Sequence, residues 1–302
     1  ARCLQSPSET WVDAQNLSEG GLDFISETLR FPKFILASKV IQESFPRVDY
    51  YRDYTTVFLW DLKLDAAAEA AGRVSVSKNG FLVVWSKSNI LTICTGSSGL
   101  FDEVMAEGLV LPEEPFADRV LFSVLRRKVK DYEAITQALE RKTASLEEQP
   151  LGLTQRSFLE ECFVLKKEIQ RALYNLWHFR QVVDSIWNRR KGANGGAAGA
   201  ADFLGVLLQE AQYLYETLEN VKDSVISLIE LHINTVSLDM NRVMRLLAVI
   251  TALSLFPAII GGLLGENLVD QPYNVKLWEV FFVVGSLMGL GLYGFWRKGW
   301  LR

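Results

Sequence analysis

Two long apolar runs near the C-terminus constrain this 302-residue chain more than any other feature of its sequence. Residues 246–264 carry no charged side chain, and residues 277–296 carry only Glu279, near their start. Each run is close to the roughly 20 residues that a helix needs to cross a hydrocarbon core about 30 Å thick. A buried hairpin of a soluble protein is the alternative, but two such runs in succession exceed ordinary core helices. The sequence therefore predicts two transmembrane helices joined by a short external loop at 265–276.

The charges beside the two spans predict their orientation. Arg242 and Arg245 precede the first span, and a basic tail at 297–302 follows the second. The loop between the spans carries Glu266, Asp270 and only one basic residue. Basic residues gather on the cytoplasmic side of membrane proteins. We therefore expect a multi-pass protein of the inner (plasma) membrane with both termini in the cytoplasm.

Two spans cannot enclose a water-filled path, so a pore would need several copies of the chain around an axis. Small and polar side chains recur every three or four residues at the start of and along the first span: Asn241, Met244, Leu247, Thr251, Leu255, Ala258 and Gly262. We interpret this stripe as the pore-facing side. The second span contains Gly285-x-x-x-Gly289, with Gly291 and Gly294 beyond. These glycines let neighbouring backbones approach, and the second span is interpreted as the packing helix.

A long helix is predicted ahead of the first span. Apolar residues from Leu204 to Leu228 follow alternating spacings of three and four, which is typical of a helix packed against its neighbours. No proline interrupts the pattern before Pro257. We therefore expect one continuous helix over about residues 202–264, roughly 95 Å long at 1.5 Å per residue. Its part at 202–245 is expected to form a cytosolic stalk.

The chain ahead of the stalk is expected to form a cytosolic α/β domain at 1–130 and a helical arm at 131–201. Charged, heptad-like patterns predict helices at 113–148 and 154–190, and we interpret their charges as solvated faces. Short apolar runs bounded by turn residues predict the strands and turns of the domain. These are strands at 55–64, 74–76, 81–85 and 90–95, with turns at 78–80 and 87–89.

Composition and residue patterns argue against several other functions. The net charge of −4 is opposite to the basic excess of a nucleic-acid-binding surface. The glycine-rich segment 191–199 lacks the ending of a phosphate-binding loop, and no nucleophile–base arrangement stands out. We therefore expect no nucleic-acid partner, no enzymatic activity and no bound cofactor. His178 and His232 stand alone on predicted helices and are interpreted as packing or solvated residues rather than metal ligands.

Several short motifs occur in order along nearly the whole chain. Residues 10–13 (TWVD) open the α/β domain, and residues 45–54 (FPRVDYYRDY) follow. The most specific stretch runs from residues 241–247 (NRVMRLL) to residues 265–267 (GEN), and the chain ends on a basic segment, RKGWL, at 297–301. In these motifs and in the order of its parts, the chain resembles the CorA family of divalent-cation (magnesium) channels.

This resemblance implies the fold and the assembly. It implies a funnel-shaped homopentamer, in which each chain contributes an α/β cytosolic domain, a long α-helical stalk and two transmembrane helices. The implied partners are further copies of the chain, the lipid bilayer and divalent cations. The implied function is transport of divalent cations, with Mg²⁺ as the first candidate and Co²⁺ or Ni²⁺ as further ones.

The resemblance also implies a site at the outer mouth of the pore. Asn267 would form a ring of amides, and Gly265 would allow the backbone to bend. Mg²⁺ gives up its water reluctantly, so neutral amide oxygens can hold the hydrated ion without stripping it. Glu266 stands where the family has Met. It adds a carboxylate to each subunit and is interpreted first as a mouth residue and second as a direct metal ligand.

A second departure from the family concerns gating. The family places a metal-sensing Asp soon after an acidic segment, and this chain has Ser38 and Lys39 there, within residues 34–39 (FILASK). Closure by high cytosolic Mg²⁺ is therefore expected to be weak or altered.

Two other functions stay open at this point. One is a zinc-type or proton-coupled transporter of the same fold, which the sequence does not distinguish from a channel. The other is a membrane-anchored scaffold without transport, against which the stripe of small and polar residues argues.

Overall fold

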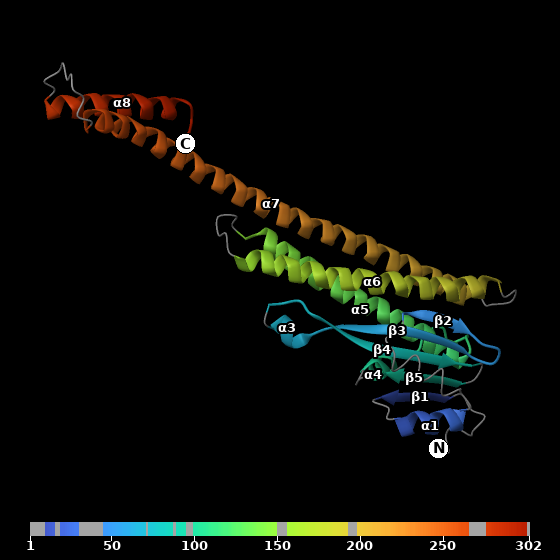
Figure 1. The fold of residues 1–302 in the computed structure, drawn as a ribbon. Helices are drawn as coiled ribbons and strands as arrows, with labels where there is room; N and C mark the ends of the chain where they lie inside the picture. The colour runs from blue at the N-terminus through green and yellow to red at the C-terminus, as the bar shows by residue number, and fades with distance from the viewer. Residues whose placement is uncertain are drawn as a thin grey trace. The chain divides into compact units, whose positions relative to one another are not determined.

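In a computed structural model of the chain, the described residues are 10–15, 19–29, 45–70, 72–86, 89–94, 99–149, 156–192, 198–265 and 276–300. They form two compact units, of which the first ends at Ile229 and the second continues from Glu230. Helix α7 (Ala198–Gly265) belongs to both units (Figure 1). The continuous helix expected at 202–264 is confirmed, and it begins four residues earlier than expected.

The first unit is built on a five-stranded sheet with the order β1-β5-β4-β3-β2. Strand β1 pairs with β5 in parallel, and the other neighbouring pairs are antiparallel. The central strands contain nearly continuous apolar runs, such as the buried FLVV of β4, because both faces of the sheet are covered. The strands are β1 (Thr10–Gln15), β2 (Arg47–Tyr50), β3 (Thr55–Leu64), β4 (Val76–Trp85) and β5 (Asn89–Cys94).

The turn expected at 78–80 is wrong, because these residues lie inside β4. Strand β4 pairs with β3 without interruption, and Asn79 lies opposite Asp61 in the register. The Lys78 ammonium lies 3.6 Å from the centroid of the Trp60 ring on β3, a cation–π contact that favours the extended strand over a turn. The strands expected at 74–76 and 81–85 are therefore one strand.

Helices cover both faces of this sheet. On one face, Ile25 of α1 (Glu19–Leu29) packs with Phe58, Leu82 and Leu91. On the other face, α5 (Phe116–Glu147) and α6 (Arg156–Gly192) lie between the sheet and the first half of α7 (Figure 1). Short helices α3 (Ala66–Ala70) and α4 (Leu100–Glu107) follow β3 and β5.

The first half of α7 packs on α5 and α6. The Trp187 indole N–H on α6 donates to the Ala201 carbonyl at 2.9 Å, and Phe203 contacts Phe122 of α5 with ring centroids 6.0 Å apart. The structure thus divides the chain differently from the expected boundaries. Helix α5 passes through the boundary at 130, and the compact unit continues to Ile229 because the apolar seam of α7 is part of its core.

Some charges on α5 and α6 are buried, which corrects their interpretation as solvated faces. The Lys128 side chain is about 1% exposed, and its ammonium pairs with Asp61 on β3 and, at 2.6 Å, with Asp131. A charge is tolerated inside a protein when it is paired and hydrogen-bonded. Burial, followed by the charges of Asp61 and Asp131, raises the pKa of the neighbouring Tyr132 phenol, so this phenol stays protonated.

Candidate pore-lining site

The second unit contains the end of α7 and helix α8 (Leu277–Arg297), and both are long and apolar enough to cross a membrane. Most of their apolar side chains are exposed in the single chain, including Phe281 and Phe282 at 69% and 71%. A water-soluble chain rarely leaves so large an apolar surface uncovered. This exposure argues against the soluble hairpin and fits helices surrounded by lipid and by other copies of the chain.

One side of each span faces the other span. A Cβ atom added at Gly291 of α8 would lie 3.0 Å from Leu253 Cδ2 and 3.5 Å from Phe256 Cε2 of α7. The less exposed residues of both spans recur every three or four positions, as in a helical hairpin. They are Val249, Ala252, Leu253, Phe256 and Ile260 on α7, and Val280, Val284, Leu287, Met288, Gly291 and Phe295 on α8.

The predicted stripe lies on another side of α7. Its span residues are all exposed in the single chain: Met244, Leu247, Thr251, Leu255, Ala258 and Gly262. At 3.6 residues per turn, the centre of this stripe lies about 150° around the helix axis from the side that contacts α8. Asn241 is also exposed, but it lies about 80° from the centre of the stripe. The structure therefore brings six of the predicted residues together on a side that α8 leaves uncovered.

The hydroxyl groups of the first span are held by the helix itself. Thr251 Oγ1 donates to the Leu247 carbonyl and Ser254 Oγ to the Ile250 carbonyl, each at 2.8 Å. A hydroxyl that donates in this way keeps its lone pairs as acceptors, so it can still face water around a cation. Ser254 is exposed beside the stripe. It was missed in the sequence, although its spacing of three from Thr251 was the signal that could have found it.

The lone charge of the second span has a structural partner. Glu279 Oε2 accepts from the Lys276 backbone N–H at 3.2 Å, and the two residues form a capping box at the start of α8. A carboxylate in the first turn of a helix satisfies a free N–H group and interacts favourably with the helix dipole. The apolar span can therefore contain this charge at its end without burying it unpaired.

Aromatic residues mark both ends of α8. Trp278 lies in its first turn, and Tyr293 and Trp296 lie near its end with ring centroids 6.1 Å apart. Eighteen residues separate the two tryptophans, which is about 27 Å along a helix. Tryptophan and tyrosine gather at the two interfaces of a bilayer whose hydrocarbon core is about 30 Å thick. The helix expected at 277–296 is confirmed and ends one residue later.

The outer mouth is described only in part. Gly265 is the last residue of α7, and no described atom beyond its own stretch of helix lies within 4 Å of a Cβ built on it. Glu266 and Asn267 lie outside the described residues, as do Ser38 and Lys39. The glycine pair Gly285-x-x-x-Gly289 does not contact α7 in the single chain, where Gly291 makes the close approach instead.

Neither histidine belongs to the stripe. His178 on α6 packs against Tyr174, Trp177 and Phe45, with ring centroids 4.5, 4.8 and 5.9 Å away. Loss of hydration lowers the pKa of its imidazole below the usual 6.5. His232 is buried on α7. In the part of the chain that the structure describes, no three His, Cys, Asp or Glu side chains come together to hold a metal ion.

Comparison with known proteins extends these observations to the whole chain. Over 98% of its length, the chain is 20% identical to the cobalt/magnesium transport protein CorA of Thermotoga maritima and covers 84% of that protein. Its fold matches the complete structure of the CorA magnesium transporter from Methanocaldococcus jannaschii, with a TM-score of 0.82, 18% identity and coverage of 96% of this chain and 90% of the other.

A further fold match is the cytoplasmic domain of ZntB from Vibrio parahaemolyticus, with a TM-score of 0.60, 10% identity and coverage of 77% of this chain and 89% of that domain. Residues 8–297 match the family described as CorA-like Mg²⁺ transporter protein. This match includes both units and the two spans. The chain therefore belongs to the family of CorA-like Mg²⁺ transporter proteins.

Proposed function

We propose that the chain is one subunit of a homopentamer that carries divalent cations across the inner (plasma) membrane, with Mg²⁺ as the main ion and Co²⁺ and Ni²⁺ as further ions. The relatives in Thermotoga and Methanocaldococcus, named as cobalt/magnesium and magnesium transporters, support this choice of ions. The observation that carries the proposal is the exposed stripe on α7, which lies on a side that α8 does not cover. In the pentamer, five such stripes face a common axis.

Charge supports the orientation of the chain in the membrane. Arg242 and Arg245 precede the apolar part of α7, and Arg297 and Lys298 follow the apolar part of α8. Because the hairpin is antiparallel, these four cations belong to the same membrane surface, which is the cytoplasmic one by the positive-inside rule. The loop with Glu266 then faces outward.

The selectivity site is assigned to the outer end of α7. Five Asn267 amides hold a hydrated divalent cation, and Gly265 provides the bend of the backbone. Glu266 raises the local cation concentration through a ring of carboxylates. The side chains of the stripe form the path below this ring, with apolar constrictions at Met244, Leu247 and Leu255.

The proposal is tested by uptake of Mg²⁺ into proteoliposomes, together with native mass spectrometry of the 34.1 kDa chain in detergent. Asn267→Ala should abolish uptake and leave the pentamer intact, whereas Leu290→Ala, an exposed residue of α8, should change neither. Glu266→Gln should reduce uptake at low salt and have little effect at high salt, because salt screens an exposed charge ring over about 8–10 Å. Normal uptake by Asn267→Ala, or a monomer or dimer in the spectrum, contradicts the proposal.

The fold match to the ZntB cytoplasmic domain favours one second candidate, a zinc-type or proton-coupled transporter. Uptake of Zn²⁺ that exceeds that of Mg²⁺, or uptake of either ion that requires a pH gradient, would establish this candidate instead. A chain that assembles but moves none of these ions would be a membrane-anchored scaffold.

A further inference from the structure

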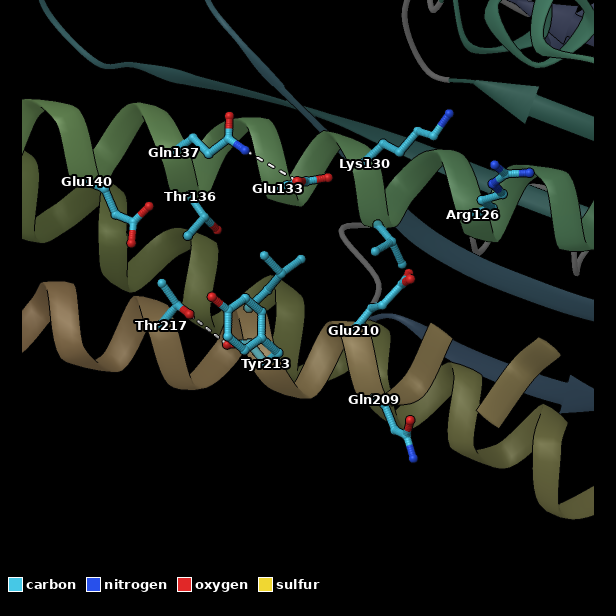
Figure 2. A pocket seen from close by; sticks show the side chains of 12 residues that line it. Arg126, Lys130, Glu133, Thr136, Gln137, Glu140, Gln209, Glu210, Tyr213 and Thr217 are labelled. Atoms are coloured by element: carbon cyan, nitrogen blue, oxygen red, sulfur yellow. Dashed lines mark hydrogen bonds between the residues drawn. The ribbon is translucent and has the colours of Figure 1, made fainter. Parts of the chain in front are cut away.

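A groove lies between α5 and α7 in the first unit, and it has no role in the proposed ion path. Its volume is about 610 Å³, and its described lining residues come from these two helices alone (Figure 2). Buried Val129 and Thr136 lie at its floor. The Tyr213 side chain lies at its wall on α7 and is 68% exposed.

Among the described residues, three carboxylates and two cations line the groove, and Arg126 and Lys130 of α5 are the cations. Glu133 and Glu140 come from α5 and Glu210 comes from α7. In Figure 2, the side chains of Glu140 and Glu210 extend toward the opposite helix. These carboxylates are not gathered into a described metal-binding group. The groove therefore has the shape to receive a helix face, and its part at Glu140, beyond the two cations of α5, suits a basic side chain.

Helix α6 carries a ridge of large exposed side chains. Phe163, Tyr174 and Trp177 are 56%, 45% and 44% exposed, and their spacings of eleven and three place them within about 60° of one another around the helix. Lys167 and Gln170 lie between them on the same side and are exposed. This α6 ridge thus joins three aromatic side chains to a lysine.

The α6 ridge and the groove lie on opposite sides of the first unit. Glu161 of α6 pairs with Lys142 of α5 at 2.9 Å. It lies about 160° around α6 from Phe163, so the ridge points away from α5. Since the groove is formed by α5 and α7, a second copy of the chain can present its ridge to the groove of the first. A contact between two different surfaces, repeated around an axis, closes into a ring.

The ridge and the groove also lie at the same level along the helices. The pairs Lys142–Glu161 and Asp118–Arg190 join the antiparallel helices α5 and α6 at two points. Interpolation between them places residues 126–140 of α5, which line the groove, beside about residues 165–179 of α6. Rotation about an axis parallel to these helices does not change the height of any residue along that axis. The α6 ridge of one copy then meets the groove of the next without any shift.

We infer that the α6 ridge of each subunit packs into the α5–α7 groove of a second copy of this chain. Phe163, Tyr174 and Trp177 fill the groove, and Lys167 pairs with its carboxylates, chiefly Glu140. This inference rests on the proposed function, in which several copies surround one axis. It goes further because it names a cytosolic surface, outside the membrane, that holds the copies together.

Cysteine cross-linking between differently tagged full-length chains tests the contact. One chain carries Gln137→Cys at the groove and the other carries Gln170→Cys on the ridge, with Cys3→Ser in both. Both glutamines are exposed, and the native Cys94 and Cys162 are buried. Oxidation in native membranes should join about half of the two chains when they are co-expressed equally, because the neighbour at the matching interface is the other chain in about half of the cases. A bond within one chain cannot join two tags, so a mixed dimer reports a contact between copies.

The controls use the same chemistry at other positions. Each single-cysteine chain expressed alone should stay uncrosslinked, because identical positions do not face each other in a head-to-tail ring. Glu27→Cys, exposed on α1 at the far face of the sheet, should replace Gln170→Cys without giving a mixed dimer. If the pentamer forms and transports Mg²⁺ but no mixed dimer appears, the ridge–groove contact is overturned and the proposed function stands. If no oligomer forms, both are overturned.

Charge reversal provides a second test in the same cross-linking assay. Lys167→Glu on the ridge should lower the yield of the mixed dimer severalfold at low salt, and adding Glu140→Lys in the groove should restore it. The difference should disappear in about 1 M salt, where charges are screened beyond about 3 Å. Failure of the double reversal to restore the yield would overturn the pairing of these two residues.

Discussion

The Lys128 ammonium lies between the Asp61 carboxylate on β3 and the Asp131 carboxylate on its own helix, with 1% of the side chain exposed. Arg127, the preceding residue, pairs with Asp131 at 3.1 Å and with Glu107 of α4 at 2.7 Å. Charged side chains therefore join a strand and two helices of the first unit. Such a network holds its elements in one arrangement because each buried charge needs its partner in place.

Lys128→Met should destabilise the first unit by about 3–5 kcal/mol, because it removes the buried cation that pairs with Asp61 and leaves Arg127 as the one described cation beside Asp131. Lys130→Met is the matched control. Lys130 is 43% exposed and pairs with Glu107 at the surface, so its loss should cost less than about 1 kcal/mol. Urea unfolding of the full-length protein measures both. Equal decreases in the free energy of unfolding for the two variants would contradict the structural role of Lys128.

The imidazole of His178 makes the free energy of unfolding depend on pH. Burial lowers its pKa in the folded protein below the 6.5 of the unfolded chain. Between these two pKa values, the unfolded chain therefore binds more protons than the folded protein. The stability contributed by His178 is therefore present above pH 6.5 and is lost as the pH falls through that window. The chain has two histidines, so nitrogen NMR of histidine-labelled protein can follow both, and His178→Gln identifies the signal. A midpoint at or above 6.5 for His178 would contradict the prediction.

At the scale of elements, the hairpin of α7 and α8 is closed by a contact at Gly291. The glycine lies against Leu253 and Phe256 of α7. Four residues after Leu253, Pro257 lacks the N–H that would pair with the Leu253 carbonyl. The close approach of Gly291 thus falls where the backbone of α7 has lost one of its own hydrogen bonds.

Gly291→Leu should separate the two spans, because even a Cβ there would come within 3.0 Å of Leu253. Overpacking of this kind typically costs about 1–3 kcal/mol. Gly294→Leu is the control, since nothing lies within 4 Å of a Cβ at that position. The thermal unfolding midpoint in detergent and Mg²⁺ uptake should both fall for Gly291→Leu and change little for Gly294→Leu. If Gly294→Leu lowered the midpoint and the uptake more than Gly291→Leu, the side of α8 that packs on α7 would not be the one at Gly291.

The elements differ in how well the sequence predicts them. Helix α7 was predicted within a few residues because its apolar spacing continues without a breaker. The strand β4 was divided wrongly, because Lys78-Asn79-Gly80 has turn composition and only its pairing with β3 reveals a strand. The burial of Lys128 was missed because its spacing on α5 resembles that of a solvated charge. Gly291 was predicted together with three other glycines of α8 to permit close approach, but a glycine spacing does not show which of them contacts α7.

At the scale of the whole molecule, the proposed homopentamer depends on contacts between copies of the chain. By the resemblance described above, Ser38 and Lys39 are expected to stand where the family has acidity. We therefore predict that millimolar Mg²⁺ changes the protease sensitivity of the assembled protein only weakly. Limited proteolysis with and without Mg²⁺ measures this effect. Strong protection by Mg²⁺, lost on neutralising acidic residues between subunits, would show that a regulatory site exists elsewhere.

The capping box at the start of α8 has a consequence for ions that approach from outside. A helix begins with roughly half a positive charge and ends with roughly half a negative one. In the proposed orientation, α7 ends and α8 begins on the outer side, so an arriving cation meets both. The Glu279 carboxylate offsets the positive start of α8, whereas the last turn of α7, which ends at Gly265, contains no basic residue to offset its negative end. The hairpin thus presents an outer surface whose backbone charge attracts cations, before any side chain of the loop contributes.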